Sequence, residues 1–382
     1  MNSSYSFIIY QNTNELPVKW DDIAISTVFL STKYLQVLEK SSPENMICHF
    51  IGIFENENLI GISISQFLNL NKLESFGGRD KCVKTKIRNI VFKNFASQVL
   101  VLGNNMLTGQ NSYALADGIN NKKAIQALHN AAYKLKTVFA EKGSKVHITT
   151  YKDFTNLEIK NFDVPELKNE YQFSTQPNMV FSINENWKTE QDYIESLSKK
   201  YRDQYKRARR KAILLEKRKL SLEEITLLED EIYELYYHVA KNAPFNTFYL
   251  PRDHFRVFKE VFKDKFLFYG YFIGDKLIGF NTLIKNGKVM DTYFLGYDDS
   301  IQRQNMLYLN MLYDMIAYSI KKNFEEIVFA RTALEIKSSV GAKPVKMFGL
   351  ISHSNKMINS LMPKIFKYLE PETIWQQRNP FK

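Results

Sequence analysis

The chain has 382 residues, a formal net charge of +11 and only two cysteines. This length exceeds the size at which a single hydrophobic core keeps growing, so we expect two domains. Apolar residues make up 45% and aromatic residues 14% of the chain, which excludes an intrinsically disordered protein. Cys48 and Cys82 fit no ligand or disulfide pattern, and the N-terminus shows no secretory signal, so we expect a cytoplasmic protein.

Two other classes of protein are disfavoured by local patterns. Residues 94–116 carry no charge, but the glutamines and asparagines among them argue against a membrane span. The six histidines are scattered without metal-ligand spacing, and no nucleophile elbow or phosphate-binding loop is present. We therefore predict no metal site and no tightly bound cofactor.

Two segments 218 residues apart repeat one pattern. Residues 50–61, FIGIFENENLIG, and residues 268–279, FYGYFIGDKLIG, share F-x-G-x-F-x-x-x-x-L-I-G without a gap. Each predicts a β-hairpin, because alternating apolar residues flank a polar turn. Strands that end in Leu-Gly follow at residues 97–104 and 289–297, and a helix and another strand come after each. The same order of elements twice indicates an internal duplication.

Each half therefore reads helix, hairpin, strand, helix, strand, which is a mixed α/β (α+β) layer architecture. Periodicity is lost and prolines appear between residues 165 and 178. We therefore predict domains at residues 1–170 and 171–382.

Much of the positive charge lies in one predicted helix, SLSKKYRDQYKRARRKA at residues 196–212. Thr189 is the expected N-cap of a continuous helix, and Asp192 completes a capping box. An apolar stripe that begins at Tyr193 and runs to Ala212 would pack on the core, and the basic residues cover the remaining surface. They form either a solvated face or a binding surface for donor phosphates, an acidic carrier protein, tRNA or anionic lipid. Nucleic acid ranks low, because the tyrosines face the core.

A second element follows the last strand of the second half. Residues 333–349, ALEIKSSVGAKPVKMFG, are similar to the F-K-x-x-F-G element of FemAB-like proteins, with aliphatic residues in place of both phenylalanines. Together with the order of elements and the basic helix, this resembles two tandem domains of the GNAT N-acyltransferase fold, in the FemAB-like branch. The resemblance covers most of the chain.

The resemblance implies an N-acyltransferase that moves an acyl group from acyl-CoA or an acylated carrier protein to a small-molecule amine. The second half would be catalytic, and the first half would be structural or would shape the substrate site. One alternative is an aminoacyltransferase that uses aminoacyl-tRNA in peptidoglycan-type synthesis. Another is a non-catalytic module that binds an anionic partner.

Four residues of the second half are candidate catalytic groups. Asp291 and Tyr293 alternate onto one face of a predicted strand, where Asp291 could accept a proton. Arg331 ends the next strand and could pair with a carboxylate or phosphate, or with Glu335. The resemblance assigns Lys337 to the family's active-site lysine, which could stabilise an oxyanion. We expect its loss to leave stability within about 0.5 kcal/mol, as for a surface residue.

The remaining candidates would bind substrate or donor. The predicted substrate-binding residues are Phe245 and Tyr249 in an apolar loop, Arg202, Lys206 and Arg209 on the basic helix, and Glu335 and Ser338 beside the lysine. The resemblance places the donor phosphates at a helix N-terminus, where backbone N–H groups favour anions. It implies donor contacts by Gln302, Gln304 and Asn305, although both glycines of the family pattern are absent there.

Overall fold

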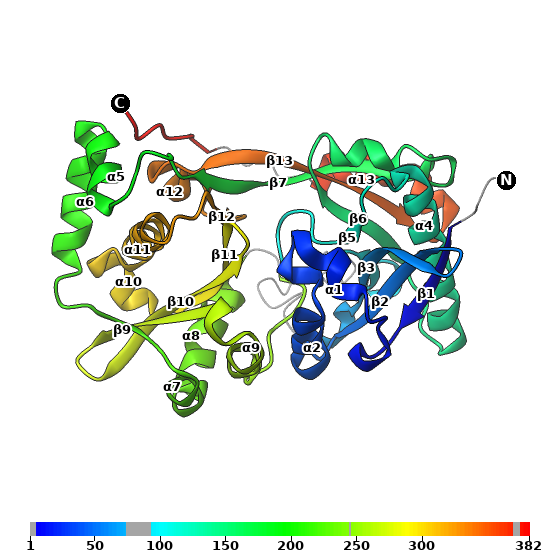
Figure 1. Cartoon of the computed structure of the whole chain (residues 1–382), viewed down its shortest axis with the longest axis horizontal. Coiled ribbons are helices and arrows are strands. Elements are labelled where there is room, and N and C mark those ends of the chain that lie inside the picture. Colours follow the sequence, from blue (N-terminus) through cyan, green and yellow to red (C-terminus); the bar gives the residue numbers. More distant parts are fainter. Residues whose placement is uncertain (1–4, 74–92, 244–245, 370–374) are drawn as a thin grey trace, which may run out of the picture. The chain divides into compact units, whose positions relative to one another are not determined.

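The computed structural model describes residues 5–73, 93–243, 246–369 and 375–382 (Figure 1). The chain forms two compact units. Unit 1 comprises Met1–Thr175, Thr247–Pro251 and Lys346–Glu372, and unit 2 comprises Gln176–Asn246, Arg252–Val345 and Thr373–Lys382. The sequence-based division at residue 170 therefore misses the segment Lys346–Glu372, which returns to unit 1.

Unit 1 contains a mixed sheet with the strand order β1-β2-β3-β4-β6-β13, and β5 pairs with β3. Its strands are β1 (Ser6–Tyr10), β2 (Met46–Glu55), β3 (Asn58–Asn69), β4 (Gln98–Leu102), β5 (Tyr113–Leu115), β6 (Ile148–Phe154) and most of β13 (Lys343–His353). Its helices are α1 (Trp20–Ile23), α2 (Thr32–Ser41), α4 (Asn121–Glu141) and α13 (Lys356–Leu369). β4 and β6 are parallel, and α4 is the crossover between them.

Unit 2 repeats this plan with the strand order β7-β12-β11-β10-β9-β8. Its strands are β7 (Tyr171–Ser182), most of which lies in this unit, β8 (Glu216–Lys219), β9 (Phe266–Ile273), β10 (Lys276–Asn286), β11 (Val289–Tyr297) and β12 (Glu326–Ala330). Its helices are α5 (Glu190–Ser196), α6 (Lys199–Lys211), α7 (Leu222–Leu227), α8 (Glu229–Asn242), α9 (His254–Phe262), α10 (Asp299–Asn305), α11 (Leu307–Lys321) and α12 (Leu334–Ser339). The mixed α/β class and the tandem arrangement are confirmed.

The two predicted hairpins are confirmed, and they match in detail. β2–β3 and β9–β10 are antiparallel pairs in separate units. The first turn has Asn56 at φ 55° and the second has Gly274 at φ 56°, 218 residues later. The pairing register also shifts at the same place, next to Ile60 in one hairpin and Ile278 in the other. A shared turn and a shared β-bulge strengthen the duplication argument, since bulges are specific features of a fold.

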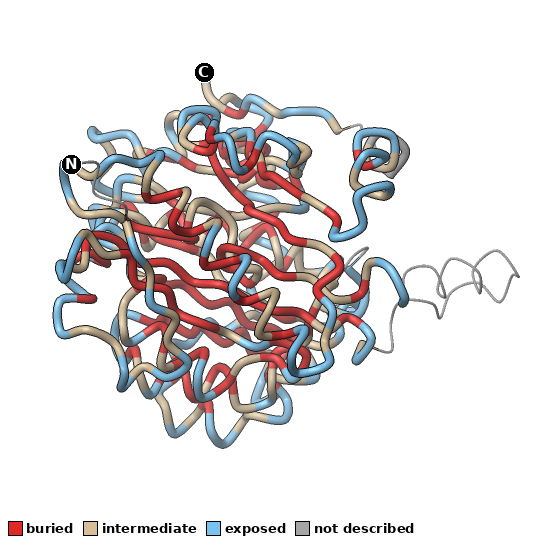
Figure 2. The backbone as a smooth tube through the Cα atoms, turned by 90° about the vertical axis from the view of Figure 1, so that its right-hand side faces the viewer, coloured by how far each residue is buried: buried red, intermediate tan, exposed pale blue. Residues whose placement is uncertain are grey.

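Helices cover both faces of the unit 2 sheet (Figure 1). Helix α8 packs on β10 and β11. On the other face, buried residues of α11 form one apolar cluster with β10, β11 and β12. Figure 2 shows buried residues concentrated along the strands. Among the residues described, α8 and α11 therefore cover opposite faces of this sheet.

The basic segment is two helices rather than the single helix predicted. Thr189 and Asp192 form the expected capping box at the start of α5. Leu197 then adopts an extended conformation (φ −68°, ψ 144°) and bridges to Phe381, and α6 begins at Lys199. The sequence pattern did not reveal this break, because its cause is a segment almost two hundred residues away. Tyr193 and Leu197 are buried in the unit 2 core as predicted.

Candidate functional site

Strands β11 and β12 separate in the middle of unit 2. They pair in parallel only over Val289–Asp291 and Glu326–Val328, and β11 continues to Tyr297 after β12 has ended at Ala330. A cavity of about 550 Å³ lies at this gap. Its lining includes Tyr236 and Ala240 of α8 and Leu312 of α11, helices that cover opposite faces of the sheet. The cavity therefore reaches through the sheet, between the strands.

The backbone at the end of β12 and directly after it has unusual φ angles. Ala330, Thr332 and Ala333 all have positive φ, at 58°, 64° and 47°. Non-glycine residues rarely adopt this region, and several together indicate local strain that the surrounding structure must hold. All three line the cavity. Strain of this kind concentrates at functional sites, so the geometry supports the gap as the site of unit 2.

Lys337 lies in α12 and lines the cavity. The expectation that it behaves as a surface residue is wrong. The residue is 4% exposed. Its Nζ donates hydrogen bonds to the carbonyl oxygens of Ala330 at 3.2 Å and Arg331 at 2.6 Å. The strained segment that begins at the last residue of β12 supplies both carbonyls. Burial lowers the pKa of Lys337 from 10.5 to about 7, because the charged form loses its hydration.

Two other predicted catalytic residues join Lys337 in the cavity lining. Arg331 follows β12, and burial lowers the pKa of its guanidinium to about 10. The Tyr293 hydroxyl lies 2.9 Å from Nε2 of His254, a fully buried histidine of α9. Sequence reasoning missed His254, since its partner is 39 residues away and no spacing pattern links them. The cavity thus combines apolar walls with the basic groups of Lys337 and Arg331 and with several tyrosine side chains, Tyr293 among them.

Asp291 does not line the cavity. It is 7% exposed, and its Oδ2 accepts a hydrogen bond from Asn286 Nδ2 at 3.0 Å, across the β10–β11 hairpin. Burial raises the pKa of its carboxyl from 3.8 to about 7. Of the candidate catalytic residues, Arg331 and Lys337 therefore share the cavity lining, and Asp291 does not. A role for Asp291 as proton acceptor stays a prediction.

The predicted donor contacts are distributed unevenly. Gln302 of α10 lines the cavity, whereas Gln304 is exposed and Asn305 Nδ2 bonds to the Ile301 carbonyl. Met306 takes a left-handed conformation (φ 48°, ψ 41°) between α10 and α11. Glycine would adopt this conformation without strain, but here a methionine adopts it. The chain thus has a break before α11 without any glycine in this segment.

Glu335 and Ser338 hold a distant segment of the chain. The guanidinium of Arg378 forms an ion pair with the Glu335 carboxylate. The backbone N–H of Arg378 donates to Ser338 Oγ at 3.0 Å. Phe381 packs nearby, since a Cβ at Gly341 would lie 2.4 Å from its Cζ. The segment Trp375–Lys382 therefore fixes α12, and these two predicted substrate-binding residues serve the fold around Lys337.

The remaining predicted binding residues lie outside the cavity lining. Phe245 falls outside the described residues, and Tyr249 belongs to unit 1. Lys206 is exposed, and Arg202 donates to the Leu197 carbonyl at 2.6 Å. Arg209 forms ion pairs with Glu190 at 2.7 Å and Asp314 at 2.6 Å. The expectation that Arg209 lies away from the packed side of the helix is therefore wrong.

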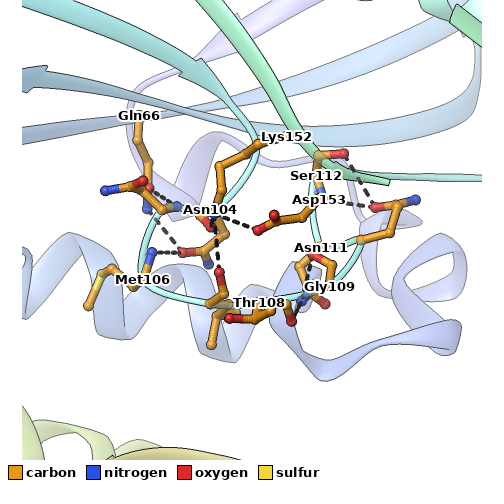
Figure 3. A network of polar contacts seen from close by, with 12 residues as sticks. Gln66, Asn104, Met106, Thr108, Gly109, Asn111, Ser112, Lys152 and Asp153 are labelled. Atoms are coloured by element: carbon orange, nitrogen blue, oxygen red, sulfur yellow. Dashed lines mark hydrogen bonds and ion pairs between the residues drawn. The ribbon is translucent and has the colours of Figure 1, made fainter. Parts of the chain in front are cut away.

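The corresponding region of unit 1 is closed by polar contacts (Figure 3). Lys152 of β6 is 9% exposed, and its Nζ donates to the carbonyls of Asn104 at 3.1 Å and Leu107 at 3.2 Å. The Asp153 carboxylate lies 2.6 Å from the same nitrogen. By strand register, Lys152 is the counterpart of Ala330, which borders the cavity in unit 2. Through these contacts, Lys152 holds the loop after β4 against the end of β6.

Two absences concern the described residues only. No group of three or more histidine, cysteine, aspartate or glutamate residues among them could hold a metal ion. In the same part of the chain, every helix is too short or too polar to cross a membrane.

A comparison with family models finds no match, and neither does one with curated proteins. Solved structures give clear matches. FemX aligns with a TM-score of 0.55 and 11% identity over 94% of this chain and 99% of that chain. A tandem GNAT protein from the clavulanic acid biosynthesis pathway aligns at 0.51 and 7%, over 92% and 99%. The C-terminal domain of a protein described as a lysylphosphatidylglycerol synthetase from Agrobacterium fabrum aligns at 0.50 and 8%, over 92% and 95%. The chain has the tandem GNAT fold, of the FemAB-like kind.

Proposed function

We propose that the protein is an N-acyltransferase whose reaction takes place in the unit 2 cavity. The observation that carries this proposal is the cavity of about 550 Å³ between β11 and β12, with buried Lys337 in its wall. An acyl donor needs an elongated channel with an apolar seat for its acyl group and a polar group near the carbonyl. The gap between two parallel strands provides both.

In the proposed reaction a neutral amine attacks the acyl carbonyl carbon, and the bond from this carbon to the donor breaks. Negative charge develops on the carbonyl oxygen as the new bond forms. Lys337 as an ammonium has three N–H donors, and two carbonyls accept from it in the structure. The third can reach the developing oxyanion, a contact that is stronger in the transition state than in the ground state. The amine proton leaves with the donor group or passes to water.

The donor we favour is acyl-CoA or an acylated carrier protein. Gln302 lines the cavity beside the start of α11, a fifteen-residue helix whose first N–H groups favour anions. The acceptor is an amine. Arg331 would attract a carboxylate or phosphate on either substrate, since a buried guanidinium in an apolar wall is a strong anion site.

The test is transfer to a panel of amines by the purified protein, with acyl-CoAs, acylated carrier protein and aminoacyl-tRNA as donors. Lys337→Gln should slow transfer on the order of 100-fold, about 3 kcal/mol, and change KM less. Arg331→Gln should mainly raise KM for an anionic substrate. Equal transfer by wild type and Lys337→Gln would refute the site. Donor binding without transfer would instead favour the non-catalytic module.

A second candidate is an aminoacyltransferase that uses aminoacyl-tRNA. The specific observation in its favour is the match to FemX, which covers 94% of this chain. The two candidates share the cavity and Lys337 and differ in the donor. Transfer from aminoacyl-tRNA, with acyl-CoA inert in the same assay, would select the second candidate.

A further inference from the structure

The turn that follows α6 exposes two adjacent aliphatic side chains. Ile213 is 81% exposed and Leu214 is 72% exposed. Single exposed apolar residues are ordinary, but two neighbours at the tip of a turn need a reason. The next residue, Leu215, packs against the unit 2 core, so the turn is attached to the fold immediately after its tip.

Basic residues surround this tip on both sides in the sequence. Before it, α6 carries exposed Lys206, Arg207, Arg210 and Lys211. Their spacing of i, i+1, i+4 and i+5 places them on one side of the helix. After it, β8 contributes Lys217, Arg218 and Lys219, of which Lys217 lies 3.6 Å from Asp314 and Lys219 lies 3.4 Å from Asp264. The acidic residue within residues 206–219 is Glu216, which lies 3.5 Å from Arg218. We call Lys206–Lys219 the basic turn.

The basic turn is held on unit 2 at both ends. On the helix side, Arg209 is tied by its ion pairs with Glu190 and Asp314. On the strand side, β8 pairs with β9, and the Arg218 guanidinium lies 3.9 Å from the ring centroid of Phe272. The exposed tip is thus presented by a fixed support.

We propose that the basic turn docks the protein on an anionic lipid bilayer, with Ile213 and Leu214 entering the head-group region. Charge complementarity selects this partner, because lysines and arginines near a negatively charged bilayer each strengthen binding. The aliphatic tip then selects lipid over nucleic acid or an acidic soluble protein. Nucleic acid would need aromatic rings to stack on its bases, but Tyr201 of α6 is buried and Tyr205 packs against Tyr313. The docking is independent of which acyl donor unit 2 uses.

The experiment is co-sedimentation of the purified full chain with vesicles of phosphatidylcholine alone and of phosphatidylcholine mixed with phosphatidylglycerol. The wild type should bind the anionic vesicles, more weakly at high salt, and bind the neutral ones poorly. The triple variant Lys206→Glu/Arg207→Glu/Arg210→Glu should lose on the order of 100-fold in binding, roughly 5-fold per basic residue. Independently, Ile213→Ser/Leu214→Ser should lose about 10-fold while the net charge is unchanged.

Each variant has a matched control elsewhere in the chain. Lys134→Glu/Lys142→Glu/Lys145→Glu makes the same charge change at exposed positions of unit 1. Val18→Ser/Ile25→Ser removes two aliphatic side chains that are 101% and 90% exposed. Both controls should bind the anionic vesicles within a few-fold of the wild type.

Three outcomes would overturn the proposal. One is the absence of binding to anionic vesicles by the wild type. Another is an equal loss of vesicle binding in a variant and in its matched control, because net charge or general hydrophobicity would then explain the loss. The third is retention of vesicle binding by the charge variant while it loses tRNA binding, which would assign the basic turn to nucleic acid. Transfer to soluble amines should be the same in Ile213→Ser/Leu214→Ser and in both controls. A wild type that docks without transferring any acyl group would separate this proposal from the enzymatic one.

Discussion

Replacing Lys337 with methionine should change how the stability of the protein depends on pH. Burial lowers the pKa of this lysine from 10.5 to about 7 in the folded protein. Between these two values the unfolded chain binds more protons than the folded one, so the free energy of unfolding of the wild type rises with pH. Below pH 7 the whole cost of the buried charge is present, on the order of 5 kcal/mol.

Methionine removes the charge at similar length, but it also leaves the carbonyls of Ala330 and Arg331 without their shared donor. That loss costs about 1–3 kcal/mol for each carbonyl and does not depend on pH. The diagnostic quantity is therefore the slope. Between pH 7 and pH 9 the wild type should gain about 2–3 kcal/mol from this group, and Lys337→Met should gain none of it.

The assay is urea unfolding, followed by tryptophan fluorescence, at several pH values from 6 to 9. Lys343→Met is the matched control, since it removes an exposed lysine just beyond α12. Lys343→Met shows how much of a change in the pH dependence of stability comes from the loss of an exposed lysine. Stability curves of wild type and Lys337→Met that run parallel over this range would refute the assignment of a buried, titrating lysine.

Three further substitutions test the fold around the site. Burial raises the pKa of the Asp291 carboxyl, so between pH 3.8 and about 7 the folded protein binds more protons than the unfolded chain, and its stability falls as the pH rises. Asp291→Asn should remove this fall. The free energy of unfolding at pH 4 and at pH 7 measures it, and an equal difference in wild type and variant contradicts the prediction. Arg209→Met should cost about 2–4 kcal/mol in urea unfolding, since it breaks two ion pairs, whereas Lys206→Met should cost less than about 0.5 kcal/mol; equal costs would count against the network. Gly341→Ala should lower the melting temperature, because φ is +110° and the new Cβ would meet Phe381; part of the loss should disappear in a Phe381→Ala background, and purely additive losses would argue against this contact.

The duplication could be predicted from the sequence because its signals are local. Gly52 and Gly270 show why the repeated pattern survives. A Cβ at either position would lie within 3 Å of the ring of the phenylalanine two residues later, at 2.9 Å in one hairpin and 2.7 Å in the other. The turn that follows needs one residue with positive φ in each half. Such requirements act within a dozen residues, so they leave a pattern in the chain.

The environment of Lys337 could not be predicted in the same way. Its position after the last strand of the half was available from the sequence, but its burial was not. Burial depends on the segment Trp375–Lys382, which fixes α12 through Arg378 and Phe381. It also depends on three left-handed residues at the end of β12 and directly after it, none of which is glycine. Neither cause has a local signature.

The break between α5 and α6 has a similar origin. The apolar stripe correctly predicted which residues are buried, since Tyr193, Leu197 and Tyr201 all lie in the unit 2 core. It could not reveal that Leu197 pairs with Phe381 as an extended residue. Helical periodicity tolerates such a break, because two short helices in sequence preserve the same buried face.

The two halves use a buried lysine in opposite ways, and hydrogen-bond capacity explains the difference. Lys152 in unit 1 has two carbonyls and a carboxylate around its nitrogen, which matches the three N–H groups of an ammonium. Lys337 in unit 2 has two carbonyl partners among the residues described, which leaves one N–H for a substrate oxygen. The Asp153 carboxylate also compensates the charge of Lys152, whereas burial works against the charge of Lys337 and brings its pKa to about 7. A compensated lysine closes a gap and stabilises a loop. An uncompensated lysine in a cavity wall gains most when negative charge develops beside it, and this is why unit 2 is the half in which we place the chemistry.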